Sequence, residues 1–137
     1  MKNQFLFLFL LFSTFCIGQN EKISFDQQID SSGAIKLRFA KNVKEAQEIA
    51  KNDILKQFIV LYISDLKFTN ITRKDRKFEK KYNSYYSIAG CLTGKLEFIE
   101  AYNHEIFEYF TKKYNKEWIY EIKKDVIGLE NYKAKNK

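Results

Sequence analysis

Residues 58–63, Phe-Ile-Val-Leu-Tyr-Ile, form an unbroken apolar run bounded by Gln57 on one side and by Ser64 and Asp65 on the other. Branched and aromatic side chains favour strands, and a strand without polar positions is typically covered on both faces. The run therefore predicts a central, doubly covered β-strand, and the segments around it indicate what covers it.

The segment before this strand predicts a helix over about residues 43–56. Asn42 is a favourable N-cap residue, and Glu45 lies three positions later, where the carboxylate of a capping box stands. Apolar and small residues then follow at mostly helical spacing. These are Val43, Ala46, Ile49, Ala50 and Ile54, with Asp53 among them.

A second strand is predicted farther back in the chain. Ile35, Leu37 and Phe39 alternate with Lys36 and Arg38, and a period of two is typical of a strand with one solvated face. With the helix, this gives a strand–helix–strand unit over residues 35–63. The two strands of this unit can pair in parallel, with the helix as the crossover, or antiparallel.

A short helix is predicted after the central strand. Thr72 or Asp75 can cap it, it runs through Phe78 and Tyr82, and Asn83 with the following Ser ends it. Residues 85–88 add a short extended piece, and residues 90–94 form a glycine-containing link.

The last third of the chain carries the clearest pattern. One apolar stripe recurs at helical spacing and consists of Phe98, Tyr102, Ile106, Tyr109 and Phe110. A second helix is expected over about 116–126, with Gly128 closing it. Its inner face carries Trp118, Ile119, Ile122 and Val126. Residues 130–137 are expected to form a flexible tail.

These elements predict a small single α+β domain over residues 34–129. A short sheet with a helix forms its N-terminal half, and two or three packed helices form its C-terminal half. The predicted core consists of Ile49, Val60, Leu61, Phe98, Tyr102, Ile106, Phe110, Trp118 and Ile122. Residues 19–33 form a polar leader segment before the domain.

The first residues predict export. Lys2 supplies a positive start, an apolar stretch runs on to Ile17, and Gly18 is a small residue suited to signal-peptidase cleavage. The stretch is shorter than the roughly 20 residues that a helix needs to cross a bilayer. Residues 1–18 are therefore expected to be a signal peptide, and the mature chain to be periplasmic or extracellular without a stable transmembrane span. A membrane anchor, or a lipoprotein modified at Cys16, is the alternative.

The net charge of +7 suits an acidic partner such as nucleic acid, lipid headgroups or an anionic polysaccharide. Nearly all the basic residues are Lys, since Arg occurs only at positions 38, 73 and 76, and Arg is the residue suited to bidentate phosphate contacts. A chain rich in Lys, Asn, Ile and Tyr, with no Pro, is also what an AT-rich coding sequence produces. The sequence thus carries no specific nucleic-acid signature, and an anionic polymer remains one candidate partner.

Three stretches near the end of the chain form a recognisable pattern: FEKKYN (residues 78–83), the pair Gly90-Cys91 and residues 102–129, YNHEIFEYFTKKYNKEWIYEIKKDVIGL. In these stretches the chain resembles a family of small exported bacterial proteins of uncharacterised activity. Members often carry a second Cys several residues after the Gly-Cys pair, where this chain has Gly94-Lys95-Leu96. The resemblance implies a shared fold and export, and it implies no activity.

Two residues are candidates for catalysis. Cys91 is the one Cys left after cleavage at Gly18, and His104 is the only His. A thiol with an imidazole base can act as a nucleophile, although a buried Cys and a His on a solvated helix face explain the same residues. His104 with Glu100 and Glu108, one turn to either side, provides too few ligands for a tight metal site.

Tyrosines are the candidates for ligand binding. Tyr82, Tyr85, Tyr86 and Tyr102 can line a groove, because a tyrosine offers contact area and a hydroxyl. The alternative is that they pack the interior of a small domain. The sequence shows no Gly-rich phosphate loop and no cluster of metal ligands, so we expect no cofactor. The function expected is that of a non-catalytic exported protein that binds a partner, which can be another exported protein, or supports the envelope. A small envelope hydrolase, and a binder of anionic polymer or membrane surface through a Lys-rich face, are the alternatives.

Overall fold

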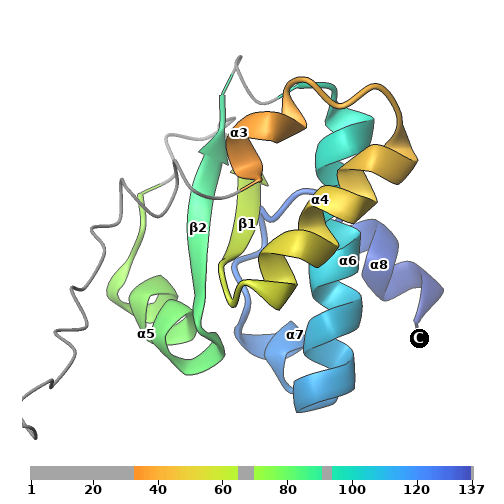
Figure 1. Ribbon diagram of the computed structural model, residues 1–137. Helices are drawn as coiled ribbons and strands as arrows, with labels where there is room; N and C mark the ends of the chain where they lie inside the picture. The colour runs from red at the N-terminus through yellow and green to blue at the C-terminus, as the bar shows by residue number, and fades with distance from the viewer. Residues whose placement is uncertain (1–32, 65–69, 91–93, 137) are drawn as a thin grey trace, which may run out of the picture.

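A computed structural model describes residues 33–64, 70–90 and 94–136, and shows an α+β fold (Figure 1). The predicted signal peptide, almost all of the leader segment and Cys91 lie outside the described residues. In chain order the elements are α3 (Ala34–Leu37), α4 (Val43–Leu55), β1 (Ile59–Ser64), α5 (Arg73–Tyr82), β2 (Ser84–Ala89), α6 (Leu96–Tyr114), α7 (Trp118–Glu121) and α8 (Leu129–Lys135).

Strand β1 is the predicted central strand, and it pairs in parallel with β2 from Ile59↔Ser84 to Ser64↔Ala89. Every apolar residue of β1 is buried, as the continuous apolar run predicted. Helices α4 and α6 lie against each other and against β1, whereas α5 lies beside β2 (Figure 1). The parallel crossover is therefore β1–α5–β2, and the predicted strand–helix–strand unit over residues 35–63 is wrong.

The predicted strand at Ile35, Leu37 and Phe39 is wrong because this segment turns into the short helix α3. The amide of Leu37 donates to the carbonyl of Gly33 at 3.1 Å. Leu37 is buried, but Phe39 is 68% exposed, so the alternation does not sort these two residues to one face. A buried carboxylate fixes the start of the turn, since both oxygens of Asp53 accept from the amide of Gly33, at 2.8 and 3.0 Å. This tertiary contact overrides the local period of two.

The caps of α4 and α5 confirm the sequence signals. Asn42 caps α4 by accepting from the amide of Glu45 at 2.9 Å. The Glu45 carboxylate accepts from the amide of Lys41, one residue earlier than a capping box requires. Thr72 and Asp75 form a complete capping box at the start of α5. Asn83 ends α5 in a left-handed conformation, with φ of 47°.

The second edge of β1 is covered by a short extended segment that follows α7. The amide of Ser64 donates to the carbonyl of Asp125, and the amide of Ile127 donates to the carbonyl of Tyr62, both at 3.0 Å. Asn103 on α6 completes this edge. Its Oδ1 accepts from the amide of Tyr62 at 3.0 Å, and its Nδ2 donates to the carbonyls of Tyr62 and Ile127, each at 2.9 Å.

The predicted helix over 116–126 is therefore wrong beyond Glu121. Ile122 leaves α7 with an extended backbone, and Val126 forms an antiparallel bridge with Ile63. Hydrogen bonds to β1 replace those that a continuing helix would make. Gly128 does not close that helix but stands at the N-cap of α8, with φ of 81°, a region that glycine adopts without strain.

The expectation of a flexible tail from residue 130 is also wrong through Lys135. Leu129 and Tyr132 of α8 are buried, and the Tyr132 hydroxyl lies 2.8 Å from the Thr111 hydroxyl. The packed unit consequently extends past the predicted boundary at residue 129.

An aromatic core fills the space among α5, α6, α7 and α8. The ring of Trp118 stacks on Phe107 with centroids 5.4 Å apart, and its Nε1 donates to Thr111 at 3.1 Å. Tyr82 and Phe110 extend the cluster toward α5. Of the predicted core residues, Ile49 is only half-buried. The others are buried, namely Val60, Leu61, Phe98, Tyr102, Ile106, Phe110, Trp118 and Ile122.

Across residues 33–64, 70–90 and 94–136, no helix is both long enough and apolar enough to span a bilayer.

Candidate binding site

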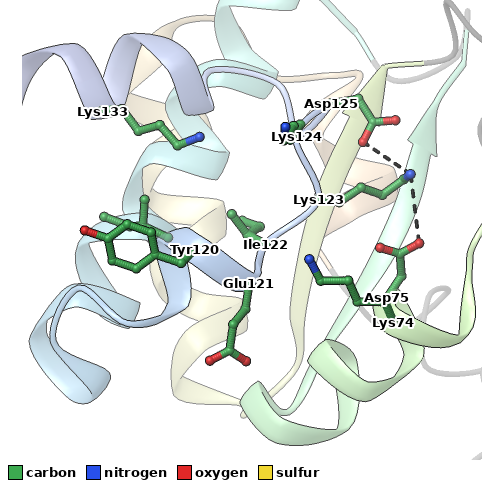
Figure 2. Close-up of a pocket in the computed structure, with 10 residues that line it drawn as sticks. Lys74, Asp75, Tyr120, Glu121, Ile122, Lys123, Lys124, Asp125 and Lys133 are labelled. Atoms are coloured by element: carbon green, nitrogen blue, oxygen red, sulfur yellow. Dashed lines mark ion pairs between the residues drawn. The ribbon is translucent and has the colours of Figure 1, made fainter.

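A surface pocket of about 580 Å³ lies where α5, α7, α8 and the segment joining α7 to α8 meet (Figure 2). Helix α5 is separated from the other elements of the pocket by β2 and α6 in the chain, and the aromatic core holds them together. The pocket is lined by Lys74, Asp75, Ile119, Tyr120, Glu121, Ile122, Lys123, Lys124, Asp125 and Lys133.

Lysines dominate the electrostatics of this pocket. Lys74 and Lys124 are exposed, and neither forms an ion pair with any residue in the described part of the chain. Lys133 pairs with Glu130 at 3.0 Å, but the Glu130 side chain is 77% exposed, so water screens this pair. These ammonium groups are therefore open to an anion that enters the pocket.

The carboxylates in the pocket are already engaged. Lys123 lies between Asp75 and Asp125, with nitrogen–oxygen distances of 3.9 and 3.6 Å (Figure 2). The same oxygen of Asp75 also accepts from the amide and the hydroxyl of Thr72, both at 2.7 Å. Asp75 thus serves the start of α5, and this triad ties α5 to the segment after α7.

Glu121 is held at the edge of the pocket by two partners from α5. Its Oε1 accepts from Lys81 at 2.7 Å and from the hydroxyl of Tyr82 at 3.2 Å. The hydrogen bond from Lys81 is the main reason that the pKa of Glu121 lies below its ordinary value. Its charge is therefore largely compensated within the protein, which leaves the cationic character of the pocket in place.

Tyr120 gives the pocket an aromatic surface. Its side chain is 84% exposed, the largest exposure among the exposed large hydrophobic residues of the described chain. It stands two residues after the buried Trp118 in the single turn of α7, so the anchoring of Trp118 turns Tyr120 outward. Lysine ammonium groups beside one exposed ring suit a ligand that carries an anionic group on a ring or an apolar body.

The tyrosines singled out from the sequence do not share a cleft. Tyr102 is fully buried and donates to Asp53 at 2.7 Å. The hydroxyl of Tyr86 accepts from the amide of Lys123 at 3.1 Å, and Tyr85 stacks on Phe58. Tyr82 packs against Phe78 and lends only its hydroxyl to Glu121. The structure thus buries the rings of Tyr82, Tyr86 and Tyr102, as the alternative explanation predicted, while Tyr85 is half-buried.

His104 lies apart from this pocket, in a smaller one of about 280 Å³ that Glu97 and Glu100 also line. Its ring contacts Tyr132 edge to face at 5.4 Å. Among the described residues, no three His, Cys, Asp or Glu side chains gather as metal ligands would. Cys91 is outside the described residues, so its pairing with His104 stays a prediction.

A buried carboxylate was not predicted as a special residue from the sequence. Asp53 is buried beneath α3 and α6, and burial is the main reason that its pKa lies above the ordinary value for an aspartate. The hydrogen bonds from Gly33 and Tyr102 act in the opposite direction. Its partners are all structural, and it joins α3, α4 and α6.

The sequence pattern predicts a site neither at Tyr120 nor at the lysines that line this pocket. The available signal was the alternation of lysines with aromatic residues in residues 112–124, but that pattern does not show which lysines meet Lys74 in space.

Comparisons with protein-family models, with curated proteins and with solved structures find no match to this chain.

Proposed function

We propose that this chain is an exported, non-catalytic binding protein, and that the pocket lined by α5, α7 and α8 binds an anionic group of its partner. The observation that carries this proposal is that Lys74, Lys124 and Lys133 line the same pocket as the exposed side chain of Tyr120. Opposite charges attract most effectively where a concave surface limits the access of water. The partner is expected to present a phosphate, sulfate or carboxylate next to a ring.

The arrangement of the acidic residues supports binding over catalysis. A general acid or base must be able to exchange a proton with a substrate in reach. Asp75 instead caps α5 and faces Lys123, while Glu121 accepts from Lys81 and Tyr82. The groups of the pocket that remain available are cationic or aromatic, which suits recognition.

Export is supported by the apolar leader and by the resemblance of residues 78–129 to small exported proteins. The mass of the protein recovered from its native host tests this part of the proposal. A mature chain that starts at Gln19 is expected. Recovery of the full-length precursor from the cytosol would contradict export.

Calorimetric titration with glucose 6-phosphate, a small probe with one phosphate and one ring, tests the pocket. At low salt we expect a dissociation constant of about 1 mM or tighter. The double variant Lys124→Gln/Lys133→Gln should raise that constant roughly fivefold or more, because it removes two of the charges that face the phosphate.

The matched control is Lys44→Gln/Lys51→Gln, which removes the same charge from the exposed surface of α4. It is expected to bind the probe within about twofold of the unmodified chain, since neither lysine lines the pocket. Equal losses in both double variants would show that net charge, and not the pocket, attracts the probe.

A further inference from the structure

Helix α5 has an outward face made only of cations. Its sequence is RKDRKFEKKY, and every basic residue in it is exposed. The residues that point inward are Asp75, Phe78, Glu79 and Tyr82. At 3.6 residues per turn, the basic residues occupy one continuous side of the helix. These exposed residues, Arg73, Lys74, Arg76, Lys77, Lys80 and Lys81, are called the α5 face below.

Both acidic residues of α5 are used inside the protein. Asp75 completes the capping box and faces Lys123. Glu79 is buried, and its Oε1 accepts from the amide of Tyr86 on β2 at 2.9 Å, while Oε2 accepts from Arg76 at 2.8 Å. Glu79 thus serves the strand beside α5 and compensates one cation. Apart from the pairs Arg76–Glu79 and Lys81–Glu121, no residue of the α5 face forms an ion pair with a described residue.

The α5 face works against the stability of its own helix. Arg73 with Lys77, and Lys77 with Lys81, are like charges one turn apart, and such pairs repel. Arg73 and Lys74 also stand in the first turn, where the helix dipole disfavours positive charge. The unfavourable charges are Arg73, Lys74 and Lys77, since Lys80 and Lys81 stand in the last turn, where the helix dipole favours positive charge. An anionic partner bound along this face would relieve the repulsion.

The α5 face continues into the binding pocket through Lys74, which belongs to both. A helix of this length spans about 15 Å. One small anion would occupy only the pocket, so contact with the whole surface requires several anionic groups spaced along a chain. Tyr120 lines the same pocket as Lys74 and offers an exposed ring surface there.

We propose, on the basis of the proposed function, that the α5 face and the pocket together bind an anionic polysaccharide. One of its sugar rings would lie on Tyr120, and the acidic groups of the polysaccharide would lie along α5. A bilayer is less suited, because the exposed apolar residues Phe39, Leu55 and Leu96 do not line the pocket or belong to α5. Single-stranded nucleic acid is less suited because it needs several stacking rings along its path, and the pocket offers only Tyr120.

The test compares the binding of a heparin octasaccharide by the unmodified chain and by Arg73→Gln/Lys77→Gln/Lys80→Gln. These positions lie outside the pocket. We expect the affinity of the triple variant to fall by roughly 30-fold or more at low salt, and its dependence on salt concentration to weaken, because fewer counterions are released. Its melting temperature should stay equal or rise, since repulsion within α5 is removed.

A matched triple variant on α4 and its C-cap residue, Lys44→Gln/Lys51→Gln/Lys56→Gln, serves as the control and should keep affinity within about threefold. Equal losses in the two triple variants, or no loss in the α5 variant, would overturn the proposal. Tighter binding of a DNA oligonucleotide of equal charge, or of vesicles with anionic lipid, would also overturn the assignment of a polysaccharide.

Glucose 6-phosphate separates this inference from the proposed function. The α5 triple variant should still bind that probe as the unmodified chain does, because Lys74, Lys124 and Lys133 are intact. If the probe binds in the pocket but the affinity for the octasaccharide is unchanged in the α5 triple variant, the inference fails and the proposed function stands. If the probe does not bind the unmodified chain, the proposed function itself fails.

Discussion

Replacing Trp118 with alanine is expected to lower the free energy of unfolding by about 3–5 kcal/mol, the range for truncating a buried aromatic side chain. The ring is fully buried, stacks on Phe107 and meets Phe110 edge to face at 5.6 Å. Its indole nitrogen also donates to Thr111, which contacts the hydroxyl of Tyr132. The substitution thus weakens the junction of α6, α7 and α8, and urea denaturation measures the loss.

Tyr120→Ala is the matched control for this substitution, because Tyr120 lies two residues later and is 84% exposed. Its effect on stability is expected to stay within about 0.5 kcal/mol. An unchanged unfolding midpoint for Trp118→Ala would show that the ring lies outside the core, and would contradict the fold described for α6, α7 and α8.

Asn103→Leu is expected to lower the free energy of unfolding by about 2–4 kcal/mol, although leucine has nearly the same size. Asn103 is fully buried and makes hydrogen bonds with both backbone groups of Tyr62 and with the carbonyl of Ile127. The amide of Tyr62 and the carbonyl of Ile127 lose these bonds. A buried polar group left without a partner costs about 1–3 kcal/mol.

Asn52→Leu makes the same chemical change at an exposed position of α4. It should alter stability by no more than about 0.5 kcal/mol. Amide hydrogen exchange adds a local readout, since the amide of Tyr62 should exchange faster in Asn103→Leu and not in Asn52→Leu. A loss below about 1 kcal/mol in Asn103→Leu would mean that the segment 125–127 does not depend on this side chain.

The sequence predicted best those elements whose signals are short in range. The caps at Asn42 and at Thr72 with Asp75 lie within three residues of the groups they bind, so the pattern itself contains the interaction. The apolar run of β1 is buried as predicted, and so is the predicted stripe of α6 except for Tyr109, which is half-buried. The α+β class followed from these elements.

The errors lie where a distant contact decides the backbone. Residues 35–39 alternate as a strand does, but the bond from Gly33 to Asp53 turns the chain into α3. The apolar residues of segment 122–126 have helical spacing, yet this segment is extended because it forms backbone hydrogen bonds with the open edge of β1. In both cases the hydrogen-bond partner lies at least twenty residues away, beyond the reach of local periodicity.

The candidate site could not be predicted from spacing because its lysines come from α5, from α8 and from the segment between α7 and α8. Three of the tyrosines predicted from the sequence as ligand-binding candidates, Tyr82, Tyr86 and Tyr102, are buried, whereas Tyr120 was turned outward by its neighbour Trp118. Net charge did indicate an anionic partner as a candidate. Net charge did not show that both acidic residues of α5 would be buried and hydrogen-bonded inside the protein, which leaves one helix face cationic.

The side-chain amine signals of lysine, followed by NMR during titration with glucose 6-phosphate, test directly where an anion binds. The signals of Lys74, Lys124 and Lys133 should shift together and saturate at one ligand concentration, while those of Lys44 and Lys51 on α4 stay in place. Shifts of similar size over all exposed lysines, or no saturable shift at the pocket, would contradict a specific anion site between α5 and α8.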